Sequence, residues 1–211
     1  MKKFLLVTLI FLMFVVSGCT QKKLSREEQL AIKARNSAAA VQVYEGYTVD
    51  ELAKAAEKVL YLIDPSDMKV THNKNSVIGN RYYWLCMLIG NTVGYDTWVI
   101  NFEEKENKCI EVSILVATIQ KNGLLPSLPT PVATNSLTFE TSALCEAEAR
   151  LFYERLEYFL GKELTWRTCE KSKEWAKEND LQIIESCGLP FMCGHNWFGI
   201  EDKTPDYLER K

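Results

Sequence analysis

Four residues near the C-terminal end of the sequence carry side chains that could bind a metal ion or form a disulfide. Cys187, Cys193 and His195 lie close together, and Cys169 precedes them. Three thiolates and an imidazole could bind zinc in a tetrahedral site, but the spacing Cys-x5-Cys-x-His matches no common zinc pattern. A structural disulfide is favoured if the protein is exported, because oxidising compartments permit disulfides. Reduced, buried thiols are the third interpretation.

A disulfide from Cys169 to the C-terminal segment would close a loop of roughly 20 residues and stabilise the fold by about 3 kcal/mol. Cys193 is the preferred partner, and Cys187 is the second choice. We predict no cofactor and no bound metal, with Cys187, Cys193 and His195 as the remaining metal candidates. A thiol- or metal-dependent enzyme built on these four residues is the alternative function.

We predict no catalytic residue. The sequence contains no Gly-x-Ser-x-Gly, phosphate-loop, His-Glu-x-x-His or Cys-x-x-Cys motif. His72 is the only other histidine, and its polar neighbours are typical of a solvated turn. The charged residues between 146 and 157 are expected on the solvent face of a helix, and they include Glu148 and Arg155.

The N-terminal segment contains the most specific motif. Two lysines precede a 13-residue run, Phe4–Val16, that is apolar except for Thr8. The run is shorter than the ~20 residues that span a bilayer, and the layout is typical of a cleaved signal peptide over residues 1–18. The residues Val16-Ser17-Gly18-Cys19 resemble the lipobox of bacterial lipoproteins.

This resemblance implies that Cys19 receives diacylglycerol, becomes the first residue of the mature protein and gains a further acyl chain such as palmitate. Each buried methylene contributes about 0.8 kcal/mol, and two or more chains anchor a protein stably. The expected location is the cell envelope, at the periplasm or the cell surface. Thr20 follows the cysteine in place of Asp, which favours the outer over the inner membrane if the cell is Gram-negative.

Composition excludes one class of partner. The formal net charge is −3, and nucleic-acid binders usually show a basic face, so no nucleic-acid partner is predicted. The expected partners are the membrane, through the acyl chains on Cys19, and an envelope protein of unknown identity. The hydrophobic content of 47% is enough for a real core.

Two helices are predicted from capping boxes near the start of the mature chain. Ser25 and Glu28 begin the first, which is expected to run to about Val43 as part of an anchor and spacer region, residues 19–47. Thr48 and Glu51 begin the second, whose apolar residues recur at helical spacing up to Ile63. A single domain is expected over residues 48–211.

Four strands are predicted next, over residues 68–72, 77–89, 96–104 and 109–119, with a turn at 91–94. Residues 121–140 are expected to form a Pro-rich connection, and a lid over an apolar pocket is a third functional possibility for it. A long helix ending near Leu160 before Gly161 and a short helix near 169–177 follow. The predicted fold class is therefore α+β, a four-stranded antiparallel meander with helices on one face, a two-layer sandwich.

The strand order also excludes one disulfide. Cys86 and Cys109 are expected on the second and fourth strands, about 9.6 Å apart across an intervening strand. A disulfide needs Cα atoms within about 7 Å, so no bridge between them is predicted.

A second resemblance covers roughly residues 50–205. The segments DPSDM, DTWVI, LFYERLEYFLGKELTWRTC and MCG, in this order, are similar to small proteobacterial lipoproteins of unknown function. That family implies no activity, but its cysteine-bearing segments coincide with Cys169 and Cys193, which supports pairing them. The sequence thus predicts a lipid-anchored envelope protein with a non-catalytic binding or accessory role.

Overall fold

The computed structural model describes residues 24–65, 67–87, 90–124, 137–140, 144–179 and 181. The chain divides into two compact units, Met1–Ile32 and Lys33–Lys211, and the second unit begins before the expected boundary at residue 48. Helix α2 (Arg26–Ala39) starts in the first unit and ends in the second. Within the described residues, no helix has the length and apolarity that crossing a membrane requires.

The first predicted helix is shorter than expected, because a strand replaces its last turn. The capping box at its start is confirmed, since Ser25 Oγ accepts from Glu28 N at 3.1 Å and Glu28 Oε2 accepts from Ser25 N at 2.7 Å. The helix ends at Ala39, and β1 (Val41–Glu45) follows at once. Branched and aromatic residues such as Val41, Val43 and Tyr44 suit a strand better than a helix, and β1 pairs antiparallel with β5.

Helix α3 (Val49–Ile63) is confirmed with its cap. Glu51 N donates to Thr48 Oγ1 at 3.3 Å, and Thr48 N donates to Glu51 Oε2 at 2.9 Å, so two terminal amides find partners. The whole predicted apolar stripe is buried: Leu52, Ala55, Ala56, Val59, Leu60 and Ile63.

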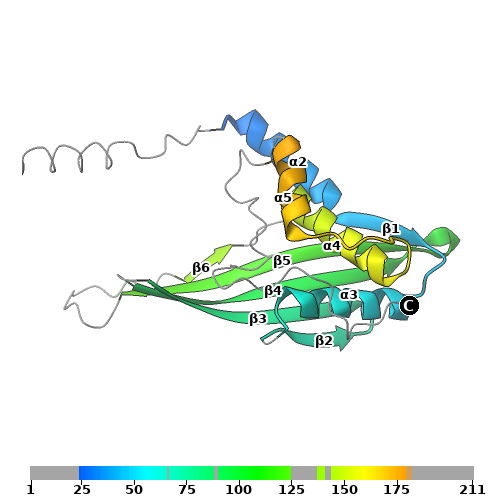
Figure 1. The fold of residues 1–211 in the computed structure, drawn as a ribbon, viewed down its shortest axis with the longest axis horizontal. Coiled ribbons are helices and arrows are strands. Elements are labelled where there is room, and N and C mark those ends of the chain that lie inside the picture. Colours follow the sequence, from blue (N-terminus) through cyan, green and yellow to red (C-terminus); the bar gives the residue numbers. More distant parts are fainter. Residues whose placement is uncertain are drawn as a thin grey trace, which may run out of the picture. The chain divides into compact units, whose positions relative to one another are not determined.

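Among the described residues the sheet has six antiparallel strands, and the predicted four-stranded meander forms four consecutive strands of it. These four strands are β2 (Lys69–Asn73), β3 (Ser76–Met87), β4 (Gly90–Glu104) and β5 (Cys109–Leu124). The order is β1-β5-β4-β3-β2, and β6 (Leu137–Glu140) pairs with the far part of β5. The prediction of four strands therefore missed two strands that pair with β5. These are β1 and β6, and β6 lies inside the Pro-rich connection (Figure 1).

The predicted turn at residues 91–94 is wrong. These residues belong to β4, which starts at Gly90 and pairs with β3 from Met87 back to Ser76. Likewise β5 continues to Leu124, and Gly90 pairs with Leu124. β4 and β5 are thus longer than predicted, and Figure 1 shows the three central strands running on beyond α3 and α4.

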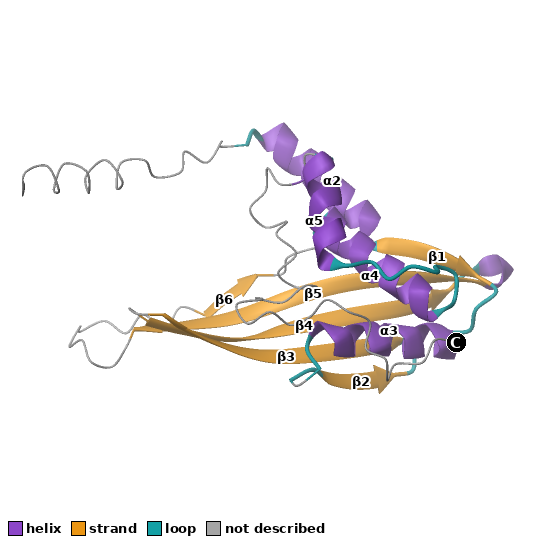
Figure 2. Cartoon of the chain, viewed as in Figure 1, coloured by secondary structure: helices purple, strands orange, loops and turns teal. Residues whose placement is uncertain are grey.

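The hydrophobic core lies between one face of the sheet and the helices α3 and α4 (Figure 2). Apolar side chains at every second position of β4 and β5 are all buried on this face: Trp98, Ile100, Phe102, Ile110, Val112, Ile114 and Val116. Gly79 on β3 allows α3 to approach closely, because a Cβ there would lie 3.0 Å from Leu60 Cδ1 and 3.1 Å from Met68 Sδ.

Helix α4 (Glu146–Phe159) and helix α5 (Cys169–Glu178) complete the helical layer. The apolar side of α4 and its flanking leucines are buried: Leu144, Leu151, Phe152, Leu156, Phe159 and Leu160. Gly161 follows with φ +76°, as expected for a glycine that ends a helix. The start of α4 contacts the end of α2, where Asn36 Oδ1 accepts from Glu146 N at 3.1 Å.

The prediction that no disulfide joins Cys86 to Cys109 agrees with the strand register. Cys86 pairs with Asn91, and Asn91 pairs with Gly123. Cys109 starts the same strand at its opposite end. Because each residue of a strand advances about 3.3 Å, the level of Cys86 lies about 46 Å from Cys109 along the strand direction.

Candidate functional site

The sequence-predicted site residues are only partly within the described chain. Cys19, Cys187, Cys193 and His195 lie outside the described residues. Cys169 is buried at the first residue of α5, and its sulfur, like that of Cys145, is disulfide-bonded. The pairing of Cys169 with Cys193 remains a prediction. Among the described residues, no group of acidic, histidine or cysteine side chains could hold a metal ion.

His72 lies on β2 and faces helix α3. Its Nε2 lies 3.1 Å from Glu57 Oε2, and both side chains are partly exposed. The contact links an edge strand to the helical layer, so His72 lies in a paired strand and not in the solvated turn that its neighbours indicated.

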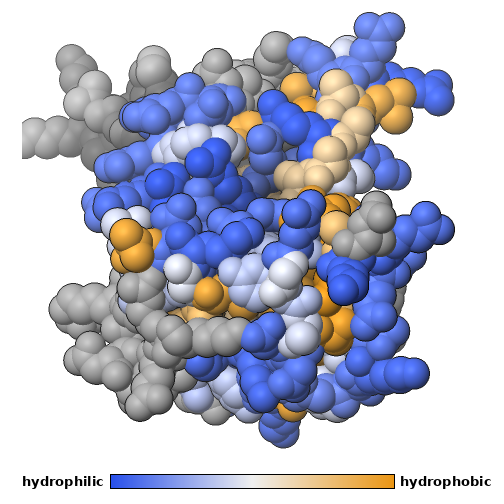
Figure 3. Space-filling view, turned by 90° about the vertical axis from the view of Figure 1, so that its right-hand side faces the viewer, coloured by the Kyte–Doolittle hydropathy of each residue, from blue (hydrophilic) through white to orange (hydrophobic). Residues whose placement is uncertain are grey.

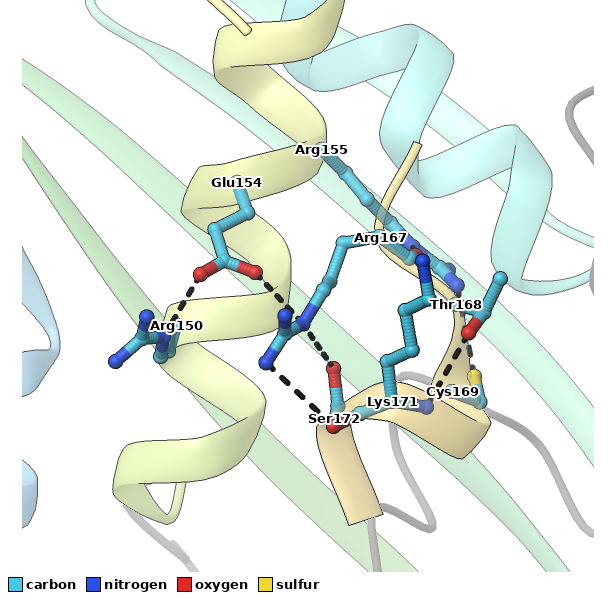
Figure 4. A network of polar contacts seen from close by, with 8 residues as sticks. All are labelled: Arg150, Glu154, Arg155, Arg167, Thr168, Cys169, Lys171 and Ser172. Atoms are coloured by element: carbon cyan, nitrogen blue, oxygen red, sulfur yellow. Dashed lines mark hydrogen bonds and ion pairs between the residues drawn. The ribbon is translucent and has the colours of Figure 1, made fainter. Parts of the chain in front are cut away.

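A network of charged side chains joins α4 to α5 (Figure 4). Glu154 on α4 is its centre: Arg150 Nε donates to Oε1 at 2.7 Å, and Arg167 Nε forms an ion pair with Oε2 at 3.0 Å. Arg167 also contacts Ser172 Oγ at 3.4 Å. One carboxylate thus holds two guanidinium groups, one from α4 itself and one from the segment before α5.

Arg155 forms the buried half of this network. Its Nε donates to the Arg167 carbonyl at 3.2 Å, and its Nη2 lies 3.5 Å from Cys169 Sγ. Its guanidinium stacks over the Trp166 ring at 4.6 Å. Only 2% of Arg155 is exposed, so its burial depends on these partners.

The prediction of a solvent-facing charged side for α4 is wrong at Arg155 and at Glu148. Both are buried, although other charges of this helix are exposed as expected. The physical reason is that α4 packs between the sheet and α5 and is therefore covered on two sides. The charge pattern alone gave no signal for this, because α5 is separated from α4 by an irregular segment.

A second set of buried polar side chains, which the sequence did not indicate, lies on the sheet. Arg81 and Asp96 oppose each other on β3 and β4 and are 5% and 4% exposed. Arg81 Nη2 donates to Asp96 Oδ2, and its guanidinium lies 5.1 Å from the Trp98 ring centroid. Arg81 Nε and Trp98 Nε1 are buried without a hydrogen-bond partner among the described residues. The pair occupies the core side of the sheet directly beyond Gly79.

Two tyrosines and one glutamate have shifted proton affinities. Burial raises the pKa of Tyr44 and of Tyr153 above the ordinary range. Burial also raises the pKa of Glu157, while Lys162 and a hydrogen bond from Gln42 oppose the shift. These groups lie where α4 meets β1.

The face of the sheet opposite the helices carries exposed apolar side chains. Ile78, Val99 and Leu115 lie opposite one another in register on β3, β4 and β5. Leu115 is 45% exposed, and Val43 on β1 is 52% exposed. We call these four residues the open face. Figure 3 shows that the side of the molecule seen there is largely hydrophilic, with apolar patches.

Comparisons with protein-family models, with curated proteins and with solved structures find no significant match for this chain. The two resemblances noted above therefore rest on the sequence motifs alone.

Proposed function

We propose that this protein is a lipoprotein of the bacterial cell envelope, attached through acyl chains on Cys19, with a folded domain that binds a partner protein and catalyses no reaction. The observation that carries the proposal is the Val16-Ser17-Gly18-Cys19 motif placed directly after a short apolar run with a basic start. Two acyl chains would hold the domain stably at a membrane.

The charged clusters of the described domain support a structural use of its polar groups. Glu154 is shared by Arg150 and Arg167, and Arg155 is stacked and hydrogen-bonded. A general base or a nucleophile must point toward the position that a substrate occupies. In this network the side chains are directed at one another, as Figure 4 shows.

The open face is the surface that suits a protein partner. Exposed apolar groups gathered on one face are typical of interaction sites. Leu115 and Val43 belong to a rigid sheet whose other side is fixed by the core, so a partner would find a preformed surface.

Mass spectrometry of the protein purified from its native membrane tests the anchor. The expected result is a chain that begins at Cys19 and carries acyl mass on that residue. A Cys19→Ser variant should lack the added mass. An unmodified thiol in the natural chain, or a retained leader, would contradict the proposal.

Photo-crosslinking in cells tests the partner. A photoreactive residue at Leu115, on the open face, should give a discrete crosslinked protein. The matched control places the same group at Lys173, an exposed position of α5. Equal crosslinks from both positions would remove the open face from consideration, and turnover of an ester, peptide or glycan panel would contradict the non-catalytic role.

A further inference from the structure

The open face belongs to a larger uncovered side of the sheet. Helices α3 and α4 cover the opposite side and lie in front of the strands in Figure 2. On the uncovered side, Ile78, Val99 and Leu115 lie in register across β3, β4 and β5, and we call them the central row. We infer that this side packs against the same side of a second copy of the chain, as two sheets face to face. The inference deepens the proposed function and rests on it, because it names the partner of the open face.

Uncharged polar side chains flank the central row in both strand directions. In one direction Thr97 lies beside Asn80, and Thr97 Oγ1 donates to Asn80 Oδ1 at 2.8 Å. In the other direction Asn101 lies between Ser76 and Ser113. Because none of these five residues is charged, two copies can approach here without burying an unpaired charge.

An acidic row and an aromatic row follow at the two ends of this surface. Glu103 and Glu111 lie opposite each other on β4 and β5, and Lys105 Nζ lies 2.8 Å and 3.3 Å from their carboxylate oxygens. At the other end Tyr82 and Tyr95 lie opposite each other on β3 and β4 and are 46% and 53% exposed. The apolar central row therefore lies between an acidic row and an aromatic row.

The spacing of these rows makes the surface self-complementary under a two-fold rotation. Val99 lies four residues, about 13 Å, from Tyr95 on one side and from Glu103 on the other. A two-fold axis along the central row places Val99 against Val99 of the second copy, and the aromatic row of each copy against the acidic row of the other. Tyrosine hydroxyls can donate to carboxylates, and an ammonium group such as that of Lys105 can contact tyrosine rings. An axis parallel to the strands would instead bring the two acidic rows together, which like charges oppose.

The size of the surface fits a stable dimer. Five strands of the described sheet lie side by side, and at about 4.8 Å per strand they are about 24 Å wide. From Tyr95 to Glu103 the strand β4 advances about 26 Å, so the flat area is about 600 Å². The accessible area of side chains that stand out from this plane is larger, and stable interfaces bury roughly 800 Å² per partner.

An exchange of charges at Leu115 tests the inference. The full chain as the cell makes it is purified in detergent, and its mass is measured by sedimentation velocity. The natural chain should be a dimer. Leu115→Lys and Leu115→Glu should each be monomers, because the axis places position 115 of one copy against position 115 of the other. An equimolar mixture of the two variants should be dimeric again, since opposite charges then face each other.

The matched control uses Leu164, which follows α4 and is 80% exposed. Leu164→Lys and Leu164→Glu should each remain dimeric. Circular dichroism and thermal unfolding establish that all four variants are folded. In cells that make the chain with two different tags, a photoreactive residue at Leu115 should give a product that carries both tags, and the same group at Lys173 should give none.

Three results overturn the inference. The first is a natural chain that is monomeric in detergent and gives no doubly tagged product in cells. The second is a dimer that persists in both Leu115 variants, and the third is a mixture of these variants that stays monomeric. Any of the three leaves the proposed function in place if position 115 crosslinks to a different protein, whereas the absence of any crosslinked protein at position 115 contradicts both.

Discussion

Arg81 and Asp96 face each other across β3 and β4 as a buried ion pair, with Trp98 beneath the guanidinium. The pair lies where the sheet passes from its apolar core, at Val77 and Gly79, to the strand ends at Met87 and Gly90. Because a one-residue slip of β3 against β4 would separate the two charges and leave the one that stays on the core face buried without its partner, the pair helps to fix the register of these two strands.

We expect Arg81→Met to lower the free energy of unfolding by about 3–5 kcal/mol, because it leaves the Asp96 carboxylate buried without this partner. The double variant Arg81→Met with Asp96→Leu should recover most of that loss. Urea denaturation gives both values. The control is Lys54→Ala, which removes an exposed ion pair with Asp50 and should cost less than about 1 kcal/mol. A double variant no more stable than Arg81→Met would contradict the ion-pair explanation.

Replacing Tyr153 by Phe should destabilise the junction of α4, α2 and β5. Its hydroxyl lies 2.8 Å from the Ala40 carbonyl oxygen and 2.9 Å from that of Val112, and both contacts are buried. The expected loss is about 1–3 kcal/mol by thermal or urea unfolding. Tyr61→Phe, on the exposed side of α3, is the matched control, and an equal loss there would show that the effect is not specific.

Alkaline titration should reveal two tyrosines that resist ionisation. Burial raises the pKa of Tyr44 and Tyr153, so the folded state retains protons that the unfolded state releases. Stability should therefore decrease as pH rises above the ordinary tyrosine pKa. Tyrosinate absorbance should show late ionisation that coincides with loss of circular dichroism, and a single smooth titration of all tyrosines in the folded protein would contradict this.

Glu157 should make stability depend on pH in the acidic range. Burial raises its pKa in the folded state, so the folded protein binds a proton more readily than the unfolded chain. The destabilising effect of the charged form is absent below the unfolded pKa and grows as pH rises through the folded pKa. As the pH rises through the folded pKa, Glu157→Gln should become more stable than the natural protein. Unfolding curves measured at several pH values should show the two proteins converging in stability at the acidic end.

Peptide mapping under non-reducing conditions should find Cys169 linked to Cys193. The motivation is that the Cys169 sulfur is disulfide-bonded and that the sequence favours this partner over Cys187. In the natural protein, a linked peptide that joins Cys169 to any other cysteine would show the predicted pairing to be wrong.

Local sequence signals predicted the elements whose causes are local. Thr48 and Glu51 fix the start of α3, Gly161 follows the end of α4, and the alternation from Ile110 to Val116 marks the buried side of β5. These features depend on capping, backbone conformation and periodicity within a few residues. These local features were sufficient to predict the antiparallel arrangement of β2, β3, β4 and β5.

Features set by distant contacts were missed. The strand β1 forms because β5 offers it hydrogen bonds, and the Asn-Thr-Val-Gly segment at 91–94 is extended because β3 and β5 continue on both sides. Arg155 is buried because α5 covers it, and Arg81 because Asp96 lies opposite. A short-range pattern carries no information on such partners, which explains why the polar network and the strand lengths differed from expectation.

Gly79 sets a limit on how this sequence could vary. With Leu60 Cδ1 and Met68 Sδ so close to where its Cβ would lie, even a methyl group would force α3 away from the sheet or displace two packed neighbours. Homologues that keep this helix in place should therefore carry glycine here, while lineages that replace it should show compensating smaller residues at positions 60 and 68.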